Sequence, residues 1–351
     1  VFDDQARMGI SVPTSVFTSA NSGGSLPTES ENVTRPIIYG EVLNFKPTLI
    51  DVGSRMYGVA GHPLTSIGTV YDNGIVVSTS NIDLPNARFT LTSEPAGVVT
   101  CDVRGRTTHA GTYTDRVGGV LEAFLIQEVG YRASEIDQAR LSTLKQRRNM
   151  RMGIAITQKT TAMEVVDRII DGLLVFYGHN RSGALDFHVM QRPSGTPTMT
   201  FRDDVEVLEG FSWDFSEPKS KVQIAYNNNE TVISEDQAAA AVPLRRKRWL
   251  SRPYRTVVPT NGTVSAFYPY AVDEELIQTR LILPADATTV ANERLTLIGE
   301  ERKIIKAPFA VQPLQLNMGD VVAFSRPRYN LSGLWSVIGI KEDYISNTVN
   351  L

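Results

Sequence analysis

The sequence contains a single cysteine, Cys101, and four histidines among its 351 residues. One cysteine excludes an intramolecular disulfide framework, and the histidines do not supply the spacing of a zinc site. No apolar run approaches the roughly 18 residues of a membrane-spanning helix, and no signal-peptide pattern opens the sequence. We therefore expect assembly in a reducing cytosol. Val1 in place of Met indicates a segment of a longer product or a processed chain.

The chain also lacks a strong charge of either sign. Its net charge of −3 is atypical of a dedicated nucleic-acid binder, which is usually clearly basic, and gives no reason to expect an anionic membrane surface as partner. Hydrophobic residues make up 42% and charged residues 21%, a globular composition that excludes a disordered chain. The length predicts about two or three domains.

Residues 1–35 are rich in Ser, Thr, Asn and Gly. So long a loop is uncommon inside a compact domain, so we predict an extended arm or linker that lies along a neighbouring subunit. Residues 36–110 then form a first predicted β domain. Its strongest local signal is Asn73-Gly74, which predicts a tight hairpin turn and makes Gly74 a fold determinant.

A second signal in this region concerns the cysteine. Val99, Cys101 and Val103 alternate with polar residues, which is the period of a half-buried strand. Cys101 is therefore interpreted as a packed core residue and not as a reactive thiol.

Residues 111–196 have a helical character and are predicted to form an α+β insertion. Apolar residues recur at helical spacing between Val117 and Val129, with Asp115 as the predicted N-cap and Gly130 as the C-cap. Two more helices are predicted, one around Ile136–Arg148 and one after the capping box Thr161-x-x-Glu164. A hairpin with a turn at residues 178–183 closes the insertion.

Residues 197–351 return to β structure, interrupted by one helix over Ala287–Ile298. Strands are predicted at Val205–Leu208, Lys221–Tyr226, Thr256–Val258 and Lys303–Ile305, followed by a closing hairpin. In that hairpin Gly319 and Asp320 form a tight turn, Gly333 lets the chain double back, and Trp335 is buried on the returning strand. These four residues are the predicted fold determinants of this domain.

The order of these segments resembles a known arrangement. A β segment ending in PAG-VVTCDVRG (Pro95–Gly105) precedes a helical insertion ending in RSGALDF (Arg181–Phe187). The segments VQIAYNNNETV (Val222–Val232) and YPYAVDEELIQTRL (Tyr268–Leu281) follow, and then the closing GDVV and GLWSV phrases. Over residues 36–351 this order resembles the baseplate hub or tail-tip proteins of tailed bacteriophages and phage-like gene transfer agents.

The resemblance implies an α+β, β-dominated fold with two tail-tube-like β-barrel or sandwich domains, the α+β insertion and the N-terminal arm, which does not align to the family. It implies a structural virion protein of the tail, assembled in the host bacterial cytoplasm. Such hubs form rings, often trimers, that join the tail tube to a central spike or fibre. Their partners are the distal tail or tube protein, the spike and the tape-measure protein, and DNA passes only in transit. The resemblance implies no enzymatic activity, cofactor or metal.

The strongest charge feature is a basic and aromatic cluster. Its residues are Arg245, Arg246, Arg248, Trp249, Arg252 and Tyr254. Arginines interleaved with aromatic residues are able to grip single-stranded nucleic acid by charge and stacking. The favoured interpretation is a subunit contact, in which the arginines pair with carboxylates of a neighbour and Trp249 fills a pocket.

Nothing else in the sequence is arranged for catalysis. The acidic groups Asp203-Asp204 and Asp273-Glu274-Glu275 consist of adjacent residues, and adjacent carboxylates on a strand point to opposite faces and do not share a cleft. On a helix, Asp273-Glu274-Glu275 would more simply stabilise its N-terminus. No motif of a serine hydrolase, zinc protease, P-loop or dinucleotide site is present. His179 and His188 are predicted on the surface.

Two alternative functions stay open at the level of sequence. Loop tyrosines at Tyr131, Tyr177 and Tyr329 would suit a module that binds carbohydrate on a host surface. A hydrolase acting on the cell envelope would need a histidine-based site whose members are not adjacent in the chain.

Overall fold

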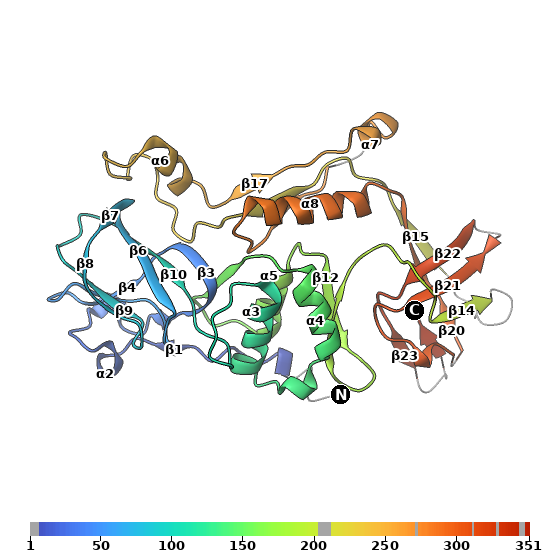
Figure 1. Ribbon diagram of the computed structural model, residues 1–351, viewed down its shortest axis with the longest axis horizontal. Coiled ribbons are helices and arrows are strands. Elements are labelled where there is room, and N and C mark those ends of the chain that lie inside the picture. The colour runs from blue at the N-terminus through green and yellow to red at the C-terminus, as the bar shows by residue number, and fades with distance from the viewer. Residues whose placement is uncertain (1–6, 203–211, 271–272, 311, 328–329, 344–347) are drawn as a thin grey trace.

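The computed structural model describes residues 7–202, 212–270, 273–310, 312–327, 330–343 and 348–351. The molecule is elongated (Figure 1). Two β-sheets lie at one end, a helical unit lies in the middle, and small sheets of the C-terminal region lie at the other end. A long helix, α8 (Pro284–Ile298), runs along the top of the helical unit.

The first β region consists of two sheets that share one core. The larger sheet has the order β11-β3-β10-β6-β7. Its strands are β3 (Ile37–Phe45), β6 (Ser66–Asp72), β7 (Ile75–Val77), β10 (Val99–Arg104) and β11 (Gly153–Ile156). The second sheet consists of β4 (Thr48–Asp51), β5 (Met56–Gly58), β9 (Arg88–Leu91) and β8 (Thr79–Asp83), in that order. Cys101 is fully buried between the sheets, which confirms its interpretation as a core residue.

Strand β3 is buried on both faces. Ile38 and Val42 point into the core of the first β region, whereas Ile37 and Tyr39 belong to the core of the helical unit. Strand β11, which follows two helices in the chain, pairs antiparallel with the edge of β3 that β10 leaves free. Gly40 allows this close crossing, because a Cβ at its φ of +67° would lie 2.1 Å from the carbonyl oxygen of Met152.

Residues 7–35 pack against their own chain. This segment contains β1 (Ser15–Val16), α2 (Ser19–Ser22), a short 3-10 turn (Thr28–Ser30) and β2 (Thr34–Arg35), and β1 pairs with β2. Phe17 is buried beneath Gly58, and the Val12 amide donates to the carbonyl of Thr160 at 2.8 Å. The segment thus covers the chain's own first sheets and helical unit, in contrast to the predicted contact with a neighbouring subunit.

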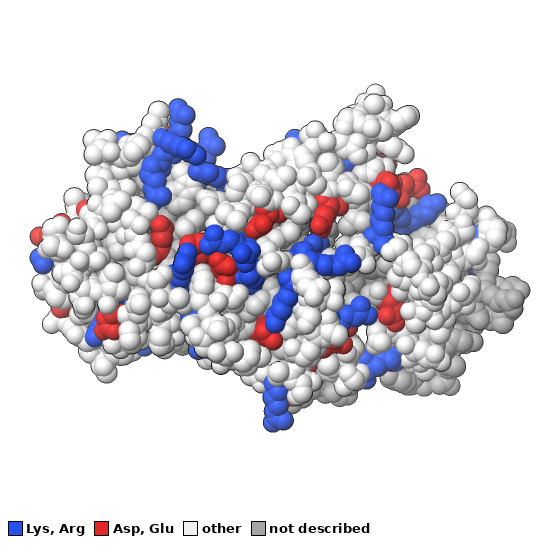
Figure 2. All heavy atoms as spheres, in the orientation of Figure 1, with Lys and Arg blue, Asp and Glu red and all other residues white. Residues whose placement is uncertain are grey.

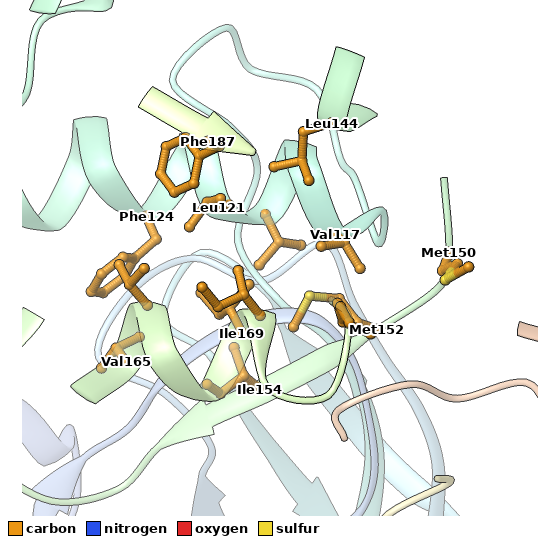
Figure 3. Close-up of a cluster of buried hydrophobic side chains, with 14 of the residues drawn as sticks. Val117, Leu121, Phe124, Leu144, Met150, Met152, Ile154, Val165, Ile169 and Phe187 are labelled. Carbon is orange, nitrogen blue, oxygen red and sulfur yellow. The ribbon is translucent and has the colours of Figure 1, made fainter. Parts of the chain in front are cut away.

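The helical unit has one large apolar core. Its elements are α3 (Val117–Phe124), a π-helical turn (Leu125–Val129), a 3-10 turn (Ala133–Glu135), α4 (Gln138–Arg147), α5 (Ala162–Ile170), β12 (Val175–His179) and β13 (Leu185–Val189). Figure 3 shows side chains of α3, α5 and β11 meeting in this core, with Leu121, Ile154 and Ile169 among them.

The structure confirms most of the predicted helix ends. Thr161 Oγ1 accepts from the Glu164 amide, and the Glu164 carboxylate accepts from the Thr161 amide, which completes the predicted capping box. Gly130 ends the first helix in a left-handed conformation. The predicted N-cap at Asp115 is wrong, because its carboxylate instead accepts from Arg151 Nε at 2.7 Å.

Residues 197–351 divide among three cores, one of which is a small cluster of Ile233, Ala238, Val242 and Leu250. Strand β16 (Gln223–Tyr226) pairs with β17 (Arg255–Val257) and β18 (Leu276–Gln278), and with α8 it packs into the core of the helical unit. The end of the chain has its own core around Phe201, Phe309 and Phe324. The predicted strand Val205–Leu208 lies outside the described residues.

The C-terminal sheets are small and open. Strands β14 (Met199–Arg202), β21 (Val321–Arg326) and β22 (Leu331–Ser336) form one sheet. A two-stranded sheet pairs β15 (Ser212–Ser216) with β19 (Arg302–Lys306). A three-stranded sheet has the order β20 (Pro308–Phe309), β24 (Thr348–Asn350) and β23 (Lys341–Asp343). A 3-10 turn spans Gln312–Gln315. The α+β, β-dominated class is confirmed, but across the described residues no sheet closes into the expected barrel.

The closing hairpin follows the prediction at its start. Gly319 has a φ of +80°, and the Asp320 carboxylate accepts from the Asn317 amide at 2.9 Å, which holds the turn before β21. The predicted reversal at Gly333 is wrong. Gly333 lies inside β22, where it pairs with Phe324 of β21.

Trp335 and His188 also differ from expectation. Trp335 is half-buried, with its ring edge-on to Phe324, so it covers the C-terminal core from one side and does not fill it. His188, predicted on the surface, is buried because the Gly319 turn lies over it and the Phe176 ring stacks on it at 5.1 Å.

We predict a pH dependence of stability through His62. The Ile38 amide donates to His62 Nε2 at 2.9 Å, and burial lowers the pKa of His62 to about 4. Since the unfolded imidazole has a pKa of about 6.5, the unfolded state binds more protons between these values. This contribution is fully present above pH 6.5 and is lost as the pH falls toward 4, by about 3 kcal/mol in total.

Urea denaturation of the wild type and of His62→Gln at several pH values measures this effect. The difference in unfolding free energy between the two proteins should shrink as the pH falls through this window. A difference that stays constant with pH would contradict the assignment.

We predict that Gly319→Ala destabilises the protein more than Gly183→Ala. Both glycines have a φ near +80°. An alanine in this left-handed conformation lowers the unfolding free energy by about 1–2 kcal/mol at either position. Only at Gly319 would the new Cβ clash, 2.1 Å from His188 Nδ1, which adds about 1–3 kcal/mol. Equal losses in chemical denaturation would show that the Gly319 turn does not press on His188.

Candidate functional site: a basic and aromatic groove

The candidate site is built on α6 (Leu244–Leu250), a short helix that rests on the first β region. Leu250 packs against the β6–β7 hairpin, where a Cβ at Gly74 would lie 2.4 Å from its Cδ1. Gly74 has a φ of +86°, as a tight turn of this type requires. The predicted turn at Gly74 therefore also seats α6.

A network of hydrogen bonds between buried polar side chains fixes the loop before α6. Thr100 Oγ1 donates to Asn44 Oδ1, and Asn44 Nδ2 donates to Asn229 Oδ1, both at 2.7 Å. Asn229 Nδ2 in turn donates to the Leu250 carbonyl at 2.8 Å. All three polar side chains are buried, so each depends on its partners for hydrogen bonds. This hydrogen-bond network links β10 and the end of β3 to the end of α6.

Arg246 lies between two aromatic rings. Its guanidinium carbon is 4.3 Å from the centre of the Tyr71 ring and 4.5 Å from that of Trp249. The Trp249 indole donates to Asn227 Oδ1 at 2.6 Å, and the Tyr71 hydroxyl donates to Asp102 at 3.0 Å. Burial, together with the Asp102 carboxylate, raises the pKa of Tyr71, so the phenol stays neutral. Cation–π contacts thus hold Arg246 inside the chain.

The other arginines of the cluster line an open groove of about 760 Å³. Its arginines are Arg245, Arg248, Arg252 and Arg255, and its aromatic side chains are Tyr226, Trp249 and Tyr254. Figure 2 shows the basic side chains gathered on the raised part of the surface formed by α6. We call this surface the basic groove.

Among the described residues, the basic groove has no negative counterpart. Within the described part of the chain, none of its four arginines has a carboxylate at ion-pair distance. The structure thus brings together all six residues predicted as an interface, but assigns them two roles. Arg246 is held against Trp249, which lines the groove, while the remaining four also line it and are available to a partner.

The sequence does not indicate that Tyr71, Asn44 and Asn229 support α6 and Arg246. Tyr71 lies far from the cluster in the chain, and its strand pattern identifies it only as a β residue. The run Asn227-Asn228-Asn229 has the composition of a loop, with no signal that its side chains are buried. Contacts between residues far apart in the sequence give no signal in the local sequence pattern.

The acidic residues form ion pairs and do not make an acid–base site. Glu274 binds Arg294 of α8 through two contacts of 2.8 Å, and Asp273 binds Lys221 at 2.9 Å. Asp203 and Asp204 lie outside the described residues. Among those that are described, no group of three or more histidine, cysteine or acidic residues could hold a metal ion. In the same part of the chain, no helix has the length and apolarity to cross a bilayer.

No protein-family model matches the sequence, and no curated protein matches it. Similarity is found among solved structures. A chain in the virion of a native gene transfer agent particle matches 93% of this chain and 84% of its own length, with a TM-score of 0.58 and 11% sequence identity. At this level of identity the match shows a shared fold.

Two prophage tail proteins are also similar, at TM-scores too low to support a conclusion. The 43 kDa tail protein of prophage MuSo2 from Shewanella oneidensis has a TM-score of 0.40 at 13% identity, with 91% of this chain and 92% of that chain covered. Tail protein gp18 of a Listeria monocytogenes EGD-e prophage has a TM-score of 0.37 at 13% identity, with 90% and 86% covered.

We predict that Asn229→Ala lowers the unfolding free energy by about 1–3 kcal/mol, because it leaves buried polar groups of Asn44 and of the α6 loop without partners. Asn292→Ala is the matched control, since Asn292 is exposed on α8. Chemical denaturation measures both changes. If the unfolding free energy falls by the same amount in both variants, the hydrogen-bond network does not hold α6 in place.

Proposed function

We propose that this chain is a structural subunit of a phage-like tail. The observation that carries the proposal is the fold shared with a chain of a gene transfer agent virion over 93% of the present chain. Within the tail, we propose the place of a hub or tail-tip component. Copies would form a ring that joins the tube to the spike or fibre and leaves a passage for DNA.

The architecture suits a mechanical role. Strand β3 belongs to two cores, and α8 packs with β16 into the larger one, so the sheets at one end are joined firmly to the helical unit. The C-terminal sheets are held to that unit by polar contacts. Arg181 Nε donates to the Leu316 carbonyl at 2.9 Å, and the Arg181 guanidinium pairs with Glu342. Such a body transmits force between neighbours without a moving catalytic part.

The partners we propose are further copies of the chain and other tail proteins. The proposed location of the chain is the tail of the virion, after assembly in the host cytoplasm.

The proposed role is non-enzymatic. The buried His62 accepts a backbone hydrogen bond, and the buried His188 contacts Asp186 at 2.9 Å beneath the Gly319 turn. Neither imidazole faces the basic groove, which would be needed for chemistry on a ligand bound there.

The carbohydrate-binding alternative has less support. Tyr131 is buried, and the Tyr177 hydroxyl donates to Asp167 at 3.0 Å from a half-buried ring. Sugar-binding platforms need exposed aromatic faces, and these two rings do not offer one. Tyr329 lies outside the described residues.

The test is the composition of purified particles. In cells that produce the particle, we expect the tagged chain to sediment with it in a density gradient, in several copies per particle, and to be labelled at the tail. Deleting the gene should reduce DNA delivery to background, and the wild-type gene should restore it. Complete, active particles formed without the chain would contradict the proposed function.

A further inference from the structure

A second exposed surface lies at the tip of α7 (Gly262–Phe267). Phe267 is 78% exposed and Tyr270 is 95% exposed, with Tyr268 beside them at 46%. The helix itself is anchored, because Asn261 caps its first turn and Val264 is buried. The tip is thus a fixed feature that holds aromatic rings in solvent. We call residues 267–270 the aromatic tip.

The basic groove and the aromatic tip lie at opposite ends of one arm. Tyr254 and Arg255 line the groove, β17 continues from them, and α7 begins a few residues later. Figure 1 shows α6 and α7 separated by the length of this arm. The tip of a chain is therefore out of reach of its own groove, whereas a second copy can present its tip there.

The chemistry of the two surfaces is complementary. The groove offers guanidinium groups that have no carboxylate among the described residues, together with the faces of Trp249 and Tyr254. The tip offers aromatic faces without charge. Guanidinium groups are weakly hydrated and stack readily on rings. The chain already uses this contact internally, where Arg246 lies between Tyr71 and Trp249.

We propose that the aromatic tip of one copy docks in the basic groove of a second copy. Because each copy carries both surfaces, the contact is heterologous and repeats head to tail, giving a ring if the rotation closes. The two most exposed rings, Phe267 and Tyr270, can each bury up to about 150–250 Å², a substantial share of the roughly 800 Å² per partner of a stable interface. The inference rests on the proposed function, which supplies the ring.

Site-directed cross-linking tests the contact directly. The native Cys101 is fully buried, so an introduced cysteine is the reactive one. Thr256→Cys places a thiol in the groove, and Pro269→Cys places one at the tip, and neither removes an arginine or a ring. On oxidation, we expect disulfide-linked dimers when the two variants are mixed. Each variant alone, and either one mixed with the exposed control Met163→Cys on α5, should stay uncross-linked.

A mixing experiment tests the head-to-tail arrangement. The tip variant Phe267→Ser/Tyr270→Ser and the groove variant Arg248→Glu/Arg252→Glu should each weaken self-association by roughly tenfold or more. Each variant keeps the surface that the other has lost. Their mixture should therefore form dimers that grow no further, as measured by sedimentation velocity. Circular dichroism of each variant establishes that it is folded.

The outcomes separate this inference from the proposed function. Cross-links between two tips, or none between tip and groove in protein that does self-associate, overturn the docking while leaving a tail role intact. Binding of a single-stranded oligonucleotide in the groove at about 0.15 M salt, without any tip–groove cross-link, would assign the groove to nucleic acid. A wild-type chain that stays monomeric and does not enter particles overturns both.

Discussion

Strand β3 joins the two largest hydrophobic cores, because one of its faces is buried in each. Alternation along a strand places neighbouring side chains on opposite faces, and here both faces are apolar. Ile38 and Val42 complete one core while Ile37 and Tyr39 complete the other. The β11 pairing adds a second constraint, since only a glycine at position 40 admits the backbone of Met152. Neither core is complete without this strand.

The basic groove depends on the same strand. Asn44 lies at its end, in a left-handed conformation, and directs its side chain to Asn229, which holds the end of α6. Tyr71 of β6, a strand of the same sheet, provides one of the two rings that hold Arg246. The arginines around the groove are therefore presented by a rigid frame. Exposed guanidinium groups that have no carboxylate partner among the described residues suit recognition of a partner surface.

Features set by local interactions could be predicted from the sequence, and features set by distant ones could not. The capping box at Thr161, the turn at Gly74 and the helix ending at Ile298 follow from residues within one or two turns of the chain. The burial of His188 depends on the Gly319 turn, which comes far later in the sequence. The six clustered residues stand out by composition alone. The role of the half-buried Arg246 differs from that of its exposed neighbours Arg245 and Arg248, and this difference depends on the position of Tyr71.

The proposed role, a subunit that works by contact with neighbours, draws on two observations: the fold shared with a gene transfer agent virion chain and the exposed surfaces at the two ends of one arm. An electron cryomicroscopy map of the intact particle tests this account most directly. The account predicts a closed ring of copies of this chain on the tail axis, with α6 of each copy at a contact with the next. A map in which the tail lacks this chain, or holds it with α6 facing solvent, would contradict the account.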